Sequence, residues 1–101
     1  MLNQKKLTTK VLVELANILA NVSKKGIIRS GDDMNNYAGL NKTGFYEIQS
    51  GVANAPTTWV WCIIIGGTGT LQLVFSASRI YVRAYTGNPL AWTTWKGVNL
   101  T

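Results

Sequence analysis

Histidine is absent from this 101-residue sequence, and cysteine occurs once. The lack of histidine excludes a Ser-His-Asp triad, a histidine metal ligand and an imidazole pH switch. A single cysteine excludes an internal disulfide and a cysteine-based zinc site within one chain. Cys62 lies in an apolar run without a base to activate it, so we expect it to pack in the core.

Long apolar runs and acidic residues are also scarce. The longest apolar run, Trp59 to Ile65, is far shorter than the roughly 20 residues of a membrane span, so we expect no membrane insertion. Only four residues are acidic, and their spacing supports no catalytic carboxylate pair. Asp32 and Asp33, followed by Asn35 and Asn36, predict a capped turn and not a calcium loop. We therefore predict no enzymatic activity, no cofactor and no metal.

The charge that is present is unevenly distributed. Residues 1–29 carry six Lys and Arg against one Glu, whereas residues 30–101 carry four against three. The segment from Ile48 to Ser78 has no charged residue. Because nucleic-acid binding needs clustered Lys and Arg, this neutral surface favours uncharged ligands such as sugars over a phosphate backbone.

Apolar residues at helical spacing predict a helix from Thr8 to Ser23, with Lys24 and Lys25 in its last turn and Gly26 as its stop. Either this helix packs on its own domain, or it packs on copies of itself as a short coiled coil. In the second case, the a and d positions at the oligomer interface are Val11, Leu15, Ile18 and Val22.

Five strand-like runs follow, separated by short Gly, Asn and Ser turns that predict sequential antiparallel pairing. The runs are 44–50, 59–65, 70–76, 79–85 and 91–100. The predicted fold class is thus α+β, mainly β. Residues 1–26 form the N-terminal helix, a shaft or trimerisation segment, and residues 27–101 form a small antiparallel β-meander or sandwich-like knob. Ile63 to Ile65 are predicted to be buried on both faces, either by the helix or by neighbouring subunits, and we favour neighbouring subunits because so short a chain has little else to cover a second face.

The aromatic and arginine residues supply the candidate binding surface. Alternation places Arg79, Tyr81, Arg83 and Tyr85 on one face of the fourth run, where they can form cation–π pairs, contact a subunit or bind a ligand. Trp59 and Trp61 share a face, whereas Trp92 and Trp95 fall on opposite faces unless a bulge intervenes, so one of the latter pair is expected to be exposed or at an interface. The candidate ligand-binding residues are Arg79, Tyr81, Arg83, Tyr85, Trp92 and Trp95.

Four segments in order carry a family resemblance: GDDMNNYAGLNKTGFYEI (31–48), NAPT (54–57), RIYVRAY (79–85) and WTTWKGV (92–98). Together they resemble the knob domains at the tips of phage tail fibres and R-type pyocin fibres, over roughly residues 27–100. The family often has proline where this chain has Thr43.

The resemblance implies a non-enzymatic, homotrimeric tip of a virion tail fibre that attaches to a bacterial surface receptor, often a polysaccharide. The N-terminal helix would then be the end of the fibre shaft. It also implies that the arginine and tryptophan positions shape the module first. Two alternatives remain open: a purely structural trimerisation module without a ligand, and a nucleic-acid-binding β domain that uses the Arg/Tyr face for stacking.

Overall fold

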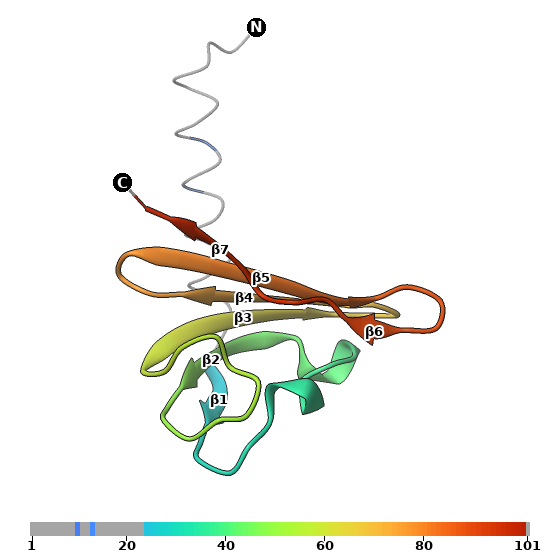
Figure 1. Ribbon diagram of the computed structural model, residues 1–101, viewed down its shortest axis with the longest axis horizontal. Coiled ribbons are helices and arrows are strands. Elements are labelled where there is room, and N and C mark those ends of the chain that lie inside the picture. The colour runs from blue at the N-terminus through green and yellow to red at the C-terminus, as the bar shows by residue number, and fades with distance from the viewer. Residues whose placement is uncertain (1–9, 11–12, 14–23, 101) are drawn as a thin grey trace, which may run out of the picture.

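The structure, a computed structural model, describes Lys10, Val13 and residues 24–100. This part of the chain forms one seven-stranded sheet (Figure 1). Its strands are β1 (Lys24–Ile28), β2 (Gly44–Ile48), β3 (Val60–Gly66), β4 (Thr70–Phe75), β5 (Arg79–Thr86), β6 (Ala91–Trp92) and β7 (Lys96–Asn99). Two short 3-10 segments, η1 (Met34–Asn36) and η2 (Leu40–Lys42), lie between β1 and β2.

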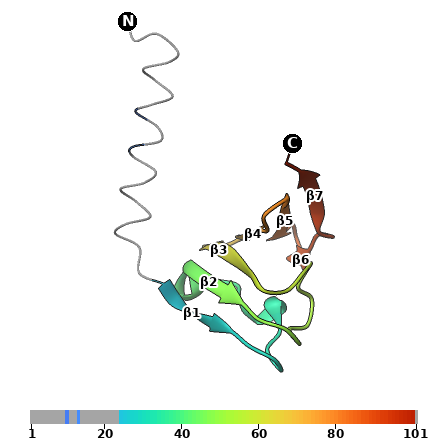
Figure 2. The same cartoon turned by 90° about the vertical axis from the view of Figure 1, so that its left-hand side faces the viewer.

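The strands follow the order β1-β2-β3-β4-β5, and both β6 and β7 pair with β5. From β2 onward the pairing is antiparallel and sequential, as the short turns predict. β1 instead pairs with β2 in parallel. The sheet is curved, and β1 and β7 lie at its two ends (Figure 2).

The connection from β1 to β2 and the connection from β2 to β3 fold over one face of the sheet and close the core there. Met34 of η1 is fully buried, and the amide of Gly39 donates to Thr70 Oγ1 on β4 at 2.9 Å. The chain passes so close to β3 that a Cβ on Gly66 would clash with the Gly39 carbonyl oxygen. The buried apolar residues are Ile28, Met34, Tyr46, Ile48, Val60, Cys62, Ile64 and Val74.

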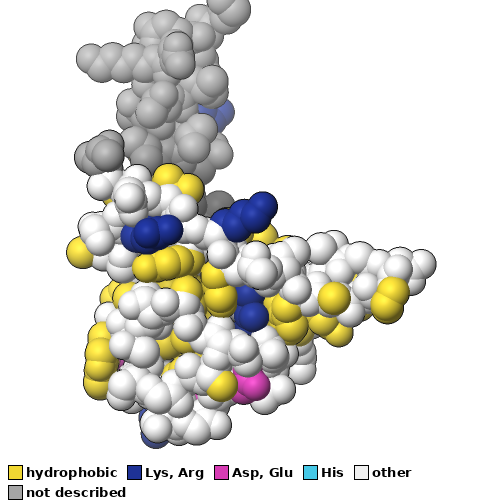
Figure 3. Space-filling view, in the orientation of Figure 1, with side chains coloured by type: hydrophobic (Ala, Val, Ile, Leu, Met, Phe, Trp, Pro, Cys, Tyr) yellow, Lys and Arg dark blue, Asp and Glu magenta, His cyan; other side chains and the backbone are white. Residues whose placement is uncertain are grey.

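The opposite face of the sheet is mostly apolar, and no element of the described residues packs over it. By strand alternation this face, which we call the open face, presents Phe45, Trp61, Ile63, Ile65, Leu71, Leu73, Phe75, Ile80, Val82, Ala84 and Val98, together with two charged residues, Glu47 and Lys96. Phe45 and Trp61 stack there with ring centroids 5.2 Å apart, and Ile65 and Val98 are 51% and 65% exposed. In Figure 3, hydrophobic side chains run along the strands, with several Lys and Arg side chains among them.

The predicted fold class is wrong. The described chain is all-β, with no helix of seven or more residues, and it forms a single sheet and not a sandwich. The predicted helix end is also wrong: Lys24 to Ile28 is extended because it pairs with β2, with a register shift between Lys24 and Gly26 that breaks regular pairing. The predicted coiled-coil seam, Val11, Leu15, Ile18 and Val22, lies outside the described residues.

Within the described residues, Ile63 to Ile65 are buried on one face alone, so burial of the other face by neighbouring subunits stays a prediction. Ile64 is fully buried, whereas Ile63 is half-buried and Ile65 is exposed, because the two flanking residues point to the open face. The predicted last strand, 91–100, is two strands interrupted at 93–95.

Candidate functional site

Arg83 of β5 is held between two tryptophan rings. Its guanidinium carbon lies 3.9 Å from the ring centroid of Trp92 and 4.7 Å from that of Trp95. The interruption between β6 and β7 allows this, because Thr93 leaves the regular strand and its hydroxyl accepts from the Ala84 amide at 2.9 Å. The two tryptophans therefore meet at Arg83 and do not occupy opposite faces of one strand.

Arg83 is also tied to the covering segment through Gln72. Its Nε donates to Gln72 Oε1 at 2.8 Å, and Gln72 Nε2 donates to the carbonyls of Met34 and Tyr37 at 2.8 and 3.0 Å. Burial leaves Arg83 only 5% exposed and lowers its pKa to about 10, against the opposing effect of Asp33. The side chain thus stays charged at neutral pH, and its Nη2 has no hydrogen-bond partner in the described structure.

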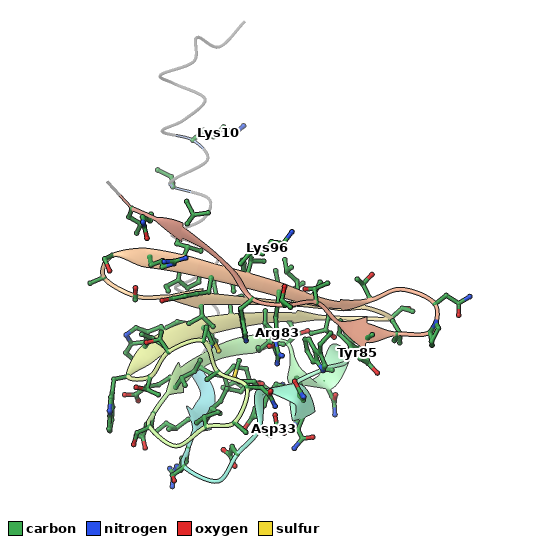
Figure 4. The ribbon with its side chains drawn as sticks, in the orientation of Figure 1. Lys10, Asp33, Arg83, Tyr85 and Lys96 are labelled. Atoms are coloured by element: carbon green, nitrogen blue, oxygen red, sulfur yellow. The ribbon has the colours of Figure 1, made fainter. Side chains whose placement is uncertain are left out.

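Asp33 fixes the loop that faces Arg83 (Figure 4). Its Oδ1 accepts from the amide of Asn35 and from Asn54 Nδ2, both at 2.8 Å. Hydrogen bonding by Asn54, and then by Asn35, lowers the pKa of Asp33. The Asn54 carbonyl in turn accepts from Trp95 Nε1 at 2.8 Å. The capped turn predicted here is confirmed, and it also connects to the tryptophan pair.

Tyr85 and Trp92 form the accessible edge of this group. Their ring centroids are 4.9 Å apart at an interplanar angle of 37°, and both side chains are half-buried. The adjoining hairpin leaves Leu90 41% exposed. We call Arg83, Tyr85, Trp92 and Trp95 the aromatic–arginine cluster. It presents the rings of Tyr85 and Trp92 in a fixed arrangement, which suits binding of a flat or polyhydroxylated ligand.

The other two candidate residues lie apart from this cluster. Arg79 and Tyr81 are at the far end of β5, where the Arg79 guanidinium lies 5.3 Å from the Tyr81 ring centroid. The predicted Arg/Tyr face therefore exists as a face, because β5 alternates regularly. This face is not exposed to solvent throughout, however. The connections on either side of β2 pack against it, and Arg83 is buried.

Sequence reasoning missed Gln72 and Asn54, which position the cluster. Gln72 is the one polar residue inside the apolar run from Leu71 to Phe75, and that isolation is a signal of a buried polar contact. Asn54 has a positive φ of 60°, which asparagine tolerates better than most residues.

Cys62 is buried in the core, as predicted, and offers no reactive group. Burial raises the pKa of its thiol to about 12. We expect iodoacetamide at pH 8 to leave Cys62 unlabelled in the native protein and to label it fully in urea, measured by intact mass. Labelling at equal rates in both conditions would contradict this burial.

The described residues contain no group of three or more His, Cys, Asp or Glu side chains placed to hold a metal ion. Within the same residues, no helix has the length and apolar character needed to cross a membrane. No protein-family model, curated protein or solved structure significantly matches this chain.

Proposed function

We propose that this protein is a non-enzymatic, homotrimeric tip domain of a phage or prophage tail fibre that attaches to a bacterial surface saccharide. The observation that carries the proposal is the aromatic–arginine cluster. Its accessible rings, Tyr85 and Trp92, contact each other, and the buried Arg83 packs against the ring of Trp92. Preorganised aromatic faces are what stacking on a sugar ring requires, because little side-chain entropy is lost on binding.

The charge of the chain from residue 30 onward, which includes every strand near the cluster, favours a neutral ligand. Residues 30–101 carry a net charge of only +1 from four basic and three acidic residues. Arg83, the most central of those basic residues, is already enclosed by two indoles and Gln72. A phosphate backbone would find few accessible cations here, so a saccharide is the better-supported ligand.

The open face supports assembly with further copies of the same chain. It spans five neighbouring strands, from β2 to β5 and β7. With strands about 4.8 Å apart and about six residues rising about 3.3 Å each, its flat area is roughly 500 Å². That is the order of the roughly 800 Å² that each partner buries in a stable interface. A copy of the chain is the occupant we propose, because an apolar face this large needs cover wherever the protein is folded.

The same face favours the second candidate function, a structural trimerisation module without a ligand. The two functions differ in what the cluster does. In the structural module the exposed edge of Tyr85 is dispensable, whereas in the receptor-binding tip it contacts sugar.

Binding of the full-length protein to immobilised surface polysaccharides from a panel of bacteria tests the proposal. We expect at least one polysaccharide to bind, and Tyr85→Ala to weaken that binding about tenfold or more, which corresponds to about 1.4 kcal/mol for one lost stacking contact. Leu40→Ala is the matched control, since Leu40 is 74% exposed in η2 and outside the cluster. Unchanged binding by the Tyr85 variant would favour the structural module.

A further inference from the structure

Trp59 has an unfavourable backbone conformation and an exposed side chain. It is the residue before β3, with φ at 57°, and its side chain is 66% exposed. A positive φ is costly for a bulky residue because Cβ approaches the carbonyl oxygen, and glycine or asparagine normally occupies such positions. Tryptophan is thus a poor choice for this position on conformational grounds.

The surrounding backbone imposes this conformation on Trp59. On one side, Asn54 is anchored through its carbonyl to Trp95 and through its amide to Asp33. On the other side, Val60 is buried and pairs with Ile48. The chain must turn between these fixed points, and a strained residue persists where its neighbours determine its conformation in this way.

No aromatic contact or hydrogen bond of the Trp59 side chain within the described structure offsets this backbone cost. Within the described structure its ring makes no aromatic contact and its indole N–H donates no hydrogen bond. The ring of Trp61 stacks on Phe45, and the indole of Trp95 donates to Asn54. Trp59 therefore contributes an open ring face at a cost in stability, which is the pattern of a residue retained for binding.

The residues next to Trp59 in the sequence favour an uncharged ligand. Trp59 lies inside the stretch from Ile48 to Ser78 that has no charged residue, and two hydroxyl residues, Thr57 and Thr58, precede it. A flat apolar ring beside neutral hydroxyls matches a sugar ring, which has an apolar C–H face and hydroxyl edges.

We propose that Trp59 is a second saccharide-contact residue, distinct from the aromatic–arginine cluster. The strand registers place the two at opposite ends of the sheet: β3 leads from Trp59 to Gly66, which pairs with Thr70, and Thr70 pairs with Tyr85. Seven residues of β3 span about 23 Å, so the two contacts would engage separate parts of one polysaccharide. This inference rests on the proposed saccharide-binding function.

Two substitutions separate a binding role from a structural one. Trp59→Asn, which places at this position the residue type already found with positive φ at Asn54, should raise the urea midpoint and weaken polysaccharide binding about tenfold or more. Trp59→Phe keeps an aromatic ring with the same backbone cost, so it should keep the wild-type midpoint and most of the binding. Leu40→Ala again serves as the exposed apolar control.

The measurements are urea unfolding, binding to the polysaccharide that the wild type binds, and solution mass. Wild-type binding by Trp59→Asn would overturn this inference and leave the proposed function intact. A lowered midpoint, or a changed solution mass, would overturn it by showing that the ring packs within the fold or against another copy. Failure of the wild type to bind any polysaccharide in the panel would overturn the proposed function and this inference together.

Discussion

Replacing Arg83 with lysine is expected to destabilise the fold by about 3 kcal/mol, measured as a lowered free energy of unfolding in urea. The planar guanidinium lies between the rings of Trp92 and Trp95 and donates through Nε to Gln72. Lysine cannot fill that space with a flat cation or donate from the same position. A buried hydrogen bond from a charged group contributes about 1.5–3 kcal/mol, and loss of the cation–π contacts adds to this. The loss is a large part of the roughly 5–15 kcal/mol that stabilises a typical domain.

Arg29→Lys is the matched control for this experiment, because it makes the same chemical change at an exposed position. We expect it to stay within about 0.5 kcal/mol of the wild type. A double-mutant cycle with Gln72→Leu should show coupling between positions 72 and 83, since each substitution removes the same hydrogen bond. If Arg83→Lys unfolded with the wild-type free energy, the sandwiched arginine would not support the fold.

Placing two carboxylates on the open face is expected to convert the assembled protein to single chains. Ile65 of β3 and Val98 of β7 are 51% and 65% exposed within one chain, so glutamate at both positions leaves the core of that chain intact. In a seam between copies, however, each carboxylate would lose its hydration, at a cost of several kcal/mol. Light scattering should give three times the chain mass for the wild type and the chain mass for the double variant.

Leu40→Glu provides the control for this second experiment, because Leu40 is 74% exposed and lies in η2, outside the strands of the open face. It should keep the wild-type mass. A wild-type protein with the mass of one chain would contradict the proposed trimer. A trimeric mass for the Ile65 and Val98 double variant would instead show that the copies contact one another through a surface other than the open face.

The positions of five strand regions could be predicted from sequence because their causes are local. Alternation of side chains and turn-forming residues define β2, β3, β4 and β5 within one or two residues. The strand β1 could not be predicted in this way, because its extended form depends on parallel pairing with β2, about 20 positions later. The break between β6 and β7 was also missed, since it is stabilised by contacts of Thr93 with Ala84 on β5.

The sequence by itself determined that Arg83 and Tyr85 share one face of β5 and that Ile80 and Val82 share the other, because a strand has a period of two. It could not decide which face is covered. Only the tertiary structure decided this, since the two connections that flank β2 fold over the polar and aromatic face and leave the apolar one open. The physical reason is that Gln72 donates a hydrogen bond to the carbonyl of Tyr37, and Arg83 contacts both Gln72 and the ring of Trp95. These partners are distant in the sequence, so no local pattern predicts them.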